Sequence, residues 1–197
     1  YRDKFGIVTK RIPLTEIHGA IRQEELVTEY EDIVITTDAM DLASWRRMAV
    51  FSWTTMLLHS MKLGFFILYY LHDRYGIKYS ELIAYVSEEC MAPGIATILR
   101  KEVTRFEAQL DLILEGYGRG RELPEFGPIY WDEEEASFLR VSEKLDQFYD
   151  ELLDLLRDFL TDRGIAWDDA ELHEAVTYQH MRIPACHPPL ITQLRFS

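Results

Sequence analysis

The sequence predicts a mainly α-helical protein: a multi-helix assembly around a long central apolar helix, with short β segments at the N-terminal end and a candidate one at the C-terminal end. Residues 45–71 are almost entirely apolar and contain no Asp or Glu. Residues 98–114 and 138–159 carry apolar side chains at steps of three and four, the spacing of amphipathic helices. Strand-like runs lie mainly in residues 1–40. This pattern suits an accessory helical region better than a complete α/β enzyme.

Two short strands are expected near the N-terminus, over residues 6–14 and 31–37. Both runs are rich in Val, Ile and Thr and are bounded by Gly, Pro or charged residues. Residues 15–30 between them fit a short helix or a loop. Because two short strands rarely form a stable sheet alone, we expect them to be the edge of a sheet whose other strands lie outside this chain.

The central helix is expected to run from Asp41 to Tyr75. Asp41 is a good N-cap, and Gly76 supplies a C-terminal stop. A helix of this length would span roughly 50 Å at 1.5 Å per residue. Gly64 is the one position within it where a bend or break is expected.

The rest of the chain is expected to hold four further helices and one clear loop. The loop is the stretch 116–131, which holds four glycines and two prolines. It lacks the upstream strand that a glycine-rich phosphate cradle needs, so phosphate binding is not expected there. Helices are expected over residues 78–90, 95–118, 132–164 and 166–181, and extended chain over 182–197. The expected parts of the chain are edge strands (1–40), a helical domain (41–190) and an extended end (191–197).

The composition is that of a folded protein, because 48% of the 197 residues are hydrophobic and 13% are aromatic. The two cysteines, Cys90 and Cys186, form no CxxC pair and cannot supply a disulfide framework. With no apolar leader segment either, the expected location is the cytoplasm. The chain does not begin with Met and ends in a strand-like run, so we expect it to be a piece of a longer protein.

The net charge of −13 is concentrated in one segment of the chain. Residues 122–174 contain seventeen acidic and four basic residues, so this segment alone carries −13. Such a surface repels phosphate backbones, and no basic stripe compensates, which excludes nucleic acid as an expected partner. The simplest interpretation of the acidic segment is a solvated helical surface.

The polar residues of the central helix are not randomly placed. At 100° per residue they fall in one narrow stripe, which consists of Ser44, Arg47, Thr55, His59, Lys62, Tyr69 and Asp73. Three interpretations remain open. A membrane span is disfavoured because His59 and Lys62 would sit at its centre, at a cost of roughly 2.5–3.5 kcal/mol for a lysine. A buried core helix with a thin polar stripe is the second.

The third interpretation is that the stripe lines a pocket. A row of Arg47, His59 and Lys62 without acids, in a strongly acidic protein, would suit an anionic ligand or the edge of a cofactor. The substrate-binding candidates on this helix are therefore Arg47, Thr55, His59 and Lys62.

Few other residues suggest chemistry. His18 follows a strand-like run and has Glu16 two residues before it, so it is a further candidate for substrate binding or acid–base work. His173 and His180 share a helix face, and Cys186 and His187 follow, but this spacing matches no zinc pattern. No nucleophile motif or four-ligand cluster is present, so no catalytic or metal-binding residue is predicted.

Three stretches resemble a known family. They are YRDKFGIVTKRIPLTEIHG (1–19), EYEDIVITTDAM (29–40) and WRRMAVFSWTTMLLHSMKLGFFILYYLHDRYGI (45–77). They are similar to the segment that follows the radical core in radical S-adenosylmethionine proteins with an N-terminal cobalamin-binding domain. The likeness is strongest over residues 1–76 and continues more weakly to HPPL near residue 190.

The resemblance implies a parent enzyme of oxidoreductase or methyltransferase type that uses a 4Fe–4S cluster, S-adenosylmethionine and cobalamin. In that family three cysteines in a CxxxCxxC motif hold the cluster, and this chain lacks the motif, so no cofactor ligand carries over to any position here. Residues 1–40 would be trailing strands of the radical core. The helices would be a non-catalytic region covering a small-molecule substrate, and its partners would be the upstream domains of the same polypeptide.

An alternative class of function stays open. The apolar faces of the helices and the acidic surface also suit a helical protein–protein interaction or dimerisation module. An exposed apolar patch larger than a few hundred Å² would favour this alternative.

Overall fold

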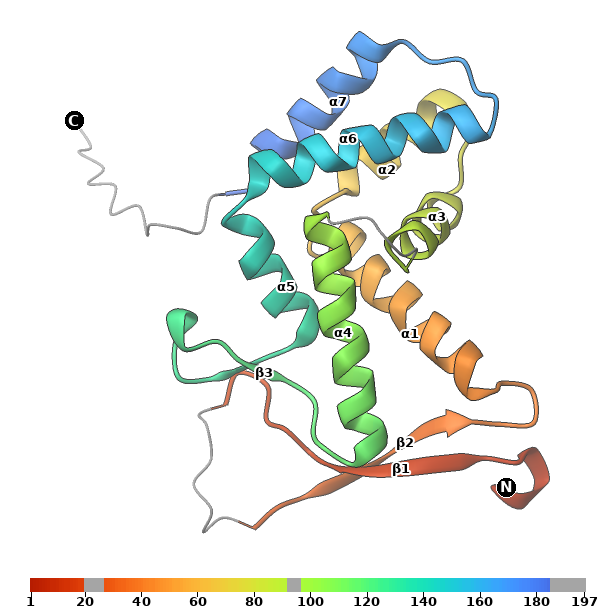
Figure 1. The fold of residues 1–197 in the computed structure, drawn as a ribbon, viewed down its shortest axis with the longest axis vertical. Coiled ribbons are helices and arrows are strands. Elements are labelled where there is room, and N and C mark those ends of the chain that lie inside the picture. Colours follow the sequence, from red (N-terminus) through yellow and green to blue (C-terminus); the bar gives the residue numbers. More distant parts are fainter. Residues whose placement is uncertain (20–26, 92–96, 185–197) are drawn as a thin grey trace.

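The computed structural model describes residues 1–19, 27–91 and 97–184, and these residues are mainly helical. Figure 1 shows a two-stranded sheet at one end of the molecule, with helices α1 and α4 rising from it and α5 beside α4. Helices α2, α6 and α7 lie at the opposite end, with α3 beside them. The helices are α1 (Leu42–Thr55), α2 (Phe65–Tyr75), α3 (Tyr79–Met91), α4 (Ile98–Glu115), α5 (Glu133–Ser142), α6 (Leu145–Asp162) and α7 (Asp169–Met181).

The N-terminal sheet consists of β1 (Val8–Pro13) and β2 (Tyr30–Thr36), which confirms the two expected strands. They pair antiparallel, with Pro13 opposite Tyr30 at one end and Val8 opposite Thr36 at the other. A small core lies where the sheet meets α1 and α4, and Ile12 at its centre is fully buried. The sheet therefore packs against both α1 and α4.

The long central helix is not formed, because residues 42–75 divide into two helices. α1 runs into a π-helical turn at Met56–Ser60, and α2 starts after a break at the predicted position, with Gly64 as its N-cap residue. A Cβ at Gly64 would lie 3.3 Å from a side-chain carbon of Leu58, so the backbone approaches closely there. Lys62 adopts a left-handed φ of +66°. The chain turns at this break, and α2 packs against α7.

Both ends of this region are as predicted. The Asp41 side chain accepts a hydrogen bond from the Ser44 amide at 2.7 Å, the N-cap interaction. Gly76 follows α2 with a φ of +68°, which a residue with a Cβ adopts only with strain.

The second long helix, expected over residues 132–164, is also divided. α5 begins with a capping box formed by Asp132 and Glu135, and Gly164 follows α6 in the left-handed conformation, so both ends are confirmed. Between them, Lys144 leaves the helical region with φ −138° and ψ 37°. α5 consequently packs on α4, whereas α6 crosses over the main core beside α7 (Figure 1).

The main core lies between α1, α2, α3, α4, α6 and α7. Its largest fully buried side chains include Leu57, Leu63, Leu68, Phe148, Leu156 and Phe159. The Tyr149 hydroxyl donates a hydrogen bond to the Leu63 carbonyl at 2.9 Å, so α6 holds the α1–α2 break in place.

Several expectations were incomplete or fall outside the described residues. The stretch expected to be a loop contains a short antiparallel pair, β3 (Arg121–Glu122) with β4 (Tyr130–Trp131). The middle of the 15–30 segment and the extended end at 185–197 lie outside the described residues. Within residues 1–19, 27–91 and 97–184, no helix has the length and apolar character needed to span a membrane.

Candidate functional site

The candidate residues of the predicted polar stripe lie in two separate places, Arg47 and Thr55 along α1 and His59 and Lys62 around the break that follows it. Arg47 is exposed on α1, where its guanidinium donates to the Ser44 hydroxyl at 3.0 Å, and the Thr55 hydroxyl donates to the Phe51 carbonyl at 2.8 Å. His59 lies twelve residues after Arg47, roughly 18 Å further along the helix axis. These polar groups therefore do not converge on one anion site.

His59 and Lys62 are brought together around one aromatic ring. The His59 ring centroid lies 5.3 Å from that of Phe65, and the Lys62 Nζ lies 5.6 Å from the same centroid. The π-helical turn between Thr55 and Lys62 changes the angular step per residue, so the 100° projection fails there. A substrate-binding role for Arg47, Thr55, His59 and Lys62 stays a prediction.

His18 is held in a strained loop against the start of α5. Its φ is +62°, and its amide donates to the Tyr130 carbonyl at 2.7 Å. Its Nε2 lies 2.6 Å from Glu135 Oε2, and its ring contacts Trp131 edge-on at 5.7 Å. The carboxylate at hydrogen-bond distance from His18 thus comes from the α5 capping box, 117 residues away in the sequence. A left-handed backbone conformation at a residue other than glycine, as at His18, often marks a functional position.

Close to this loop, a cavity of about 370 Å³ lies between α1, α4 and the start of α5, and we call it the Trp53 cavity. α1 and α4 face each other across the cavity, and each helix lines it with one stripe of side chains at helical spacing. Its volume falls in the range of small-molecule sites. Its main apolar walls are Trp45, Met48, Trp53, Met56, Phe106 and Leu110, and its polar side consists of Gln109, Arg119, Asp132, Glu133 and Glu134.

Two buried polar atoms of uncharged residues that line the cavity have no hydrogen-bond partner among the described residues. They are the Nε1 of Trp53, which is 2% exposed, and the Oε1 of Gln109, which is 1% exposed. The Trp53 ring stacks on Phe106 at 5.6 Å, and the Gln109 amide nitrogen donates to the Gly118 carbonyl at 2.9 Å. Unpaired buried donors and acceptors are uncommon and cost about 1–3 kcal/mol each. One indole donor and one amide acceptor thus remain available beside the cavity.

The acidic side of the cavity carries a carboxyl group that ionises near neutral pH. Burial raises the pKa of Glu133 to about 7, although the guanidinium of Arg121, whose Nε lies 2.8 Å from Glu133 Oε1, acts in the opposite direction. Burial also raises the pKa of Glu134. A carboxyl group with a pKa near 7 can donate or accept a proton at physiological pH.

This buried carboxyl group predicts a pH-dependent stability. Between the ordinary pKa of 4.5 and the folded value of about 7, the folded protein binds the Glu133 proton more tightly than the unfolded chain does. This contribution is complete below pH 4.5 and is lost as the pH rises through 7. As the pH rises through this window, the free energy of unfolding of E133Q should therefore fall by up to about 3 kcal/mol less than that of the wild type.

Urea denaturation at pH 4.5 and pH 8 measures this difference. The matched control is Glu125→Gln, because Glu125 is exposed and should leave the pH dependence of the wild type unchanged. An E133Q protein whose stability varies with pH as the wild type does would show that Glu133 does not ionise in this range.

A second concave surface lies between α2 and α7 at the other end of the molecule. It encloses about 770 Å³, and we call it the Tyr178 groove. It is lined by Phe65, Phe66, Tyr69, Tyr70, Asp73, Glu171, Glu174, Ala175 and Tyr178. Only Tyr69 and Asp73 of the predicted stripe lie in it.

The described residues group no three His, Cys, Asp or Glu side chains in a way that would hold a metal ion. His180 stacks on Tyr149 at 4.9 Å, and Cys186 and His187 lie outside the described part of the chain. No protein family matches this sequence, and no curated protein matches it significantly.

Sequence reasoning missed the residues of the Trp53 cavity. Gln109 gave a usable signal, because it is a polar residue on the apolar face of α4, between Phe106 and Leu110. Glu133 gave none, since it stands in a run of four consecutive acids.

Proposed function

We propose that this chain is the C-terminal helical region of a cobalamin-binding radical S-adenosylmethionine enzyme, where it covers a small-molecule substrate and is not catalytic by itself. The resemblance of residues 1–19, 29–40 and 45–77 supports the parent family. The Trp53 cavity carries the substrate-binding part of the proposal, because it combines apolar walls with a few polar groups.

The position of the cavity supports this assignment. Its lining includes Ile33 on β2 and Trp45 in the first turn of α1, so it lies beside the N-terminal sheet. In the described residues this sheet has two strands, so each strand has one edge that pairs with no other strand. A neighbouring catalytic domain that extends this sheet would lie close to the cavity.

The residues of this chain do not fit an iron–sulfur cluster. Its two cysteines, Cys90 and Cys186, are far apart in the sequence, and a cluster needs several thiolates close together. The proposal therefore assigns the cluster, S-adenosylmethionine and cobalamin to the upstream domains of the parent polypeptide.

The family assignment is tested by the coding sequence upstream of Tyr1. The proposal expects a CxxxCxxC motif and a cobalamin-binding domain in the same reading frame. It also expects the 197-residue chain, after reconstitution with iron and sulfide, to show no stoichiometric iron–sulfur absorption band. A reading frame without the cysteine motif, or a cluster bound by this chain alone, would overturn it.

The substrate-binding part is tested with a side chain that narrows the mouth of the cavity. Ser52 lines the cavity and is exposed, so Ser52→Trp obstructs it without disturbing the core. In the intact enzyme S52W should lower kcat/KM by about tenfold or more, mainly through KM. Ser80→Trp makes the same change at an exposed position of α3 and should leave kcat/KM unchanged. Equal kinetics for both variants would remove the cavity from the substrate path.

The second candidate function, a helical interaction or dimerisation module, is favoured by the Tyr178 groove. Tyr69 and Tyr178 are 57% and 51% exposed on neighbouring helices and line the same groove. Sedimentation equilibrium separates the two functions, since a dimerisation module should self-associate and Tyr178→Ala should weaken the association.

A further inference from the structure

The two walls of the Tyr178 groove run in opposite directions. At one end Phe66 of α2 meets Tyr178 of α7, with ring centroids 5.1 Å apart. At the other end the Arg74 guanidinium donates to Glu171 at 3.1 Å. α2 and α7 are therefore antiparallel neighbours, so each end of the groove combines the start of one helix with the end of the other.

One end of the groove is basic. The Lys62 ammonium lies 5.6 Å from the centroid of Phe65, and the Arg182 guanidinium lies 5.9 Å from the centroid of Phe66. Both distances are within the range of cation–π attraction. Neither Lys62 nor Arg182 forms an ion pair with a described residue. This end therefore carries two positive charges that no carboxylate of the described chain neutralises.

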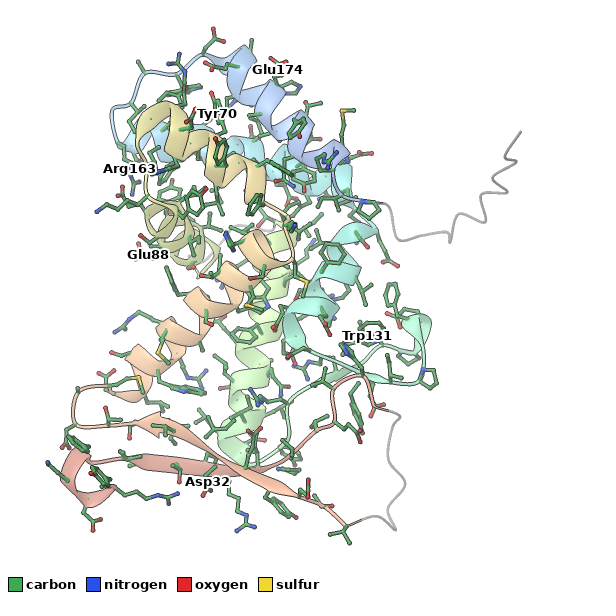
Figure 2. All side chains as sticks on the ribbon, turned by 180° about the vertical axis from the view of Figure 1, so that it is seen from behind. Asp32, Tyr70, Glu88, Trp131, Arg163 and Glu174 are labelled. Carbon is green, nitrogen blue, oxygen red and sulfur yellow. The ribbon has the colours of Figure 1, made fainter. Side chains whose placement is uncertain are left out.

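The opposite end of the groove is acidic. It is lined by Asp73, Glu171 and Glu174, and Figure 2 labels Glu174 there on α7. Glu171 is paired with Arg74, whereas Asp73 and Glu174 have no ion-pair partner in the described part of the chain. Glu174 stands eight residues before Arg182, a separation of roughly 12 Å along the helix axis. Unpaired charges of opposite sign thus lie at opposite ends of one groove.

The middle of the groove is apolar and is not used by the core of the same molecule. Tyr69 is 57% exposed there, and Ala175, the smallest side chain of the lining, leaves room beside it for a ring from outside. The opposite faces of α2 and α7 supply core residues such as Leu68 and Leu172. The exposed face of the two helices is therefore available to a partner.

The charges of the groove balance, although the protein as a whole is strongly acidic. The balance involves three basic and three acidic side chains, which are Lys62, Arg74, Arg182, Asp73, Glu171 and Glu174. Two copies of a protein with a net charge of −13 repel each other at long range, so a neutral surface is where they can approach. A twofold rotation that lays one groove on another reverses its direction. It sets the basic end of each copy on the acidic end of the other, and the contact is made twice.

We propose that the Tyr178 groove binds the same groove of a second copy of this chain. In this twofold dimer the two basic residues of each copy, Lys62 and Arg182, face Asp73 and Glu174 of the other copy. Tyr69 of each copy enters the apolar middle of the facing groove. The inference rests on the second candidate function, the dimerisation module, and names its partner and the register of the contact.

The size of the surface sets the expected affinity. α2 and α7 contain 11 and 13 residues, so they are roughly 17 and 20 Å long. Two helices of this length packed side by side offer a face of roughly 400 Å² per copy. This area is at the low end of specific interfaces, so the dimer should be reversible, with a dissociation constant on the order of 100 µM.

The test measures self-association of this chain by sedimentation equilibrium, from about 10 µM to about 1 mM, with charge-reversed variants. K62E/R182E makes both ends of the groove acidic, and D73K/E174K makes both ends basic. Each variant alone should dimerise at least about tenfold more weakly than the wild type, because like charges then meet. An equimolar mixture of the two should associate to within about threefold of the wild type, since its ends are complementary again. Damage to the surface would not be repaired by mixing.

The matched control is E88K/E115K, which makes the same charge change as D73K/E174K at exposed positions outside the groove. It should keep the dissociation constant within about twofold of the wild type. Circular dichroism checks folding, and the single variants D73K and R182E replace a pair that does not fold.

Three outcomes would overturn the inference. A wild-type chain that stays monomeric over the whole concentration range would overturn it together with the dimerisation module. A wild-type dimer that both reversed variants retain, or a mixture that does not restore association, would overturn the groove-to-groove contact alone. The parent family is tested separately by the upstream coding sequence, so its failure is distinguishable from both.

Discussion

Glu102→Ala should lower the free energy of unfolding by about 3–5 kcal/mol, because it leaves a partly buried guanidinium without its carboxylate. The Glu102 side chain is only 3% exposed on α4. Its Oε2 accepts from Arg140 Nε at 2.9 Å and from Arg140 Nη2 at 2.6 Å, which joins α4 to α5. Arg105 contacts the other carboxylate oxygen and is 53% exposed, so it can turn to water when Glu102 is removed.

Arg140 cannot turn to water in the same way. Its side chain is 17% exposed, and its other hydrogen bond among the described residues is a 3.3 Å contact with the Ser137 hydroxyl. The cost of E102A is therefore mainly the desolvation of an unpaired cation. Chemical denaturation followed by circular dichroism measures it.

The double variant E102L/R140M separates this explanation from general damage to the core. Because apolar residues of similar size often replace a buried ion pair without loss, the double variant should recover most of the stability. The control Glu115→Ala, at an exposed position of the same helix, should stay within about 0.5 kcal/mol of the wild type. A double variant no more stable than E102A would contradict the ion-pair explanation.

Gln179→Leu should lower the free energy of unfolding by about 2–5 kcal/mol, through the backbone of another helix. The first amides of a helix need acceptors, which an N-cap side chain usually supplies. The N-cap residue of α2 is Gly64, which has no side chain, and the fully buried Gln179 accepts from the Phe66 amide at 2.8 Å instead. Its nitrogen donates to the Lys62 carbonyl at 2.7 Å.

A leucine at this position leaves both backbone groups unpaired, at about 1–3 kcal/mol each. Hydrogen exchange gives a local readout, since the Phe66 amide should lose its protection in Q179L more than amides in α5 do. The matched control is Gln147→Leu, on the exposed side of α6, where a change below about 0.5 kcal/mol is expected. Unchanged protection of Phe66 would show that Gln179 does not cap α2.

Glu102 and Gln179 also show which features of the fold cannot be predicted from the sequence. Helix ends were predictable because caps and glycine stops are local, as at Asp41, Gly76, Asp132 and Gly164. The break before α2 could be placed at Gly64, but Gln179, which stabilises it, lies 113 positions after Phe66, so no local pattern reveals it.

The break between α5 and α6 has no local signal either. Val141, Leu145 and Phe148 continue the apolar spacing without interruption, and no glycine or proline stands between them. Both helices contact α4, but α5 also packs on the π-helical turn whereas α6 packs on α7, so the division depends on tertiary packing.

The candidate site was harder to predict than the fold. The polar stripe assumed one angular step from Ser44 to Asp73, and the π-helical turn removes that assumption halfway along. The Trp53 cavity depends on how α1 faces α4, and its informative groups, such as Gln109 Oε1, are distinguished only by the partners that they lack.

The cap that Gln179 provides also sets an order of events during protein synthesis. A ribosome that adds roughly 5–20 residues per second makes Gln179 roughly 6–23 s after Phe66, because 113 residues separate them. Throughout that interval the nascent chain lacks a complete α7 and the cap that closes the junction of α1 and α2, and α6 is completed only late in it.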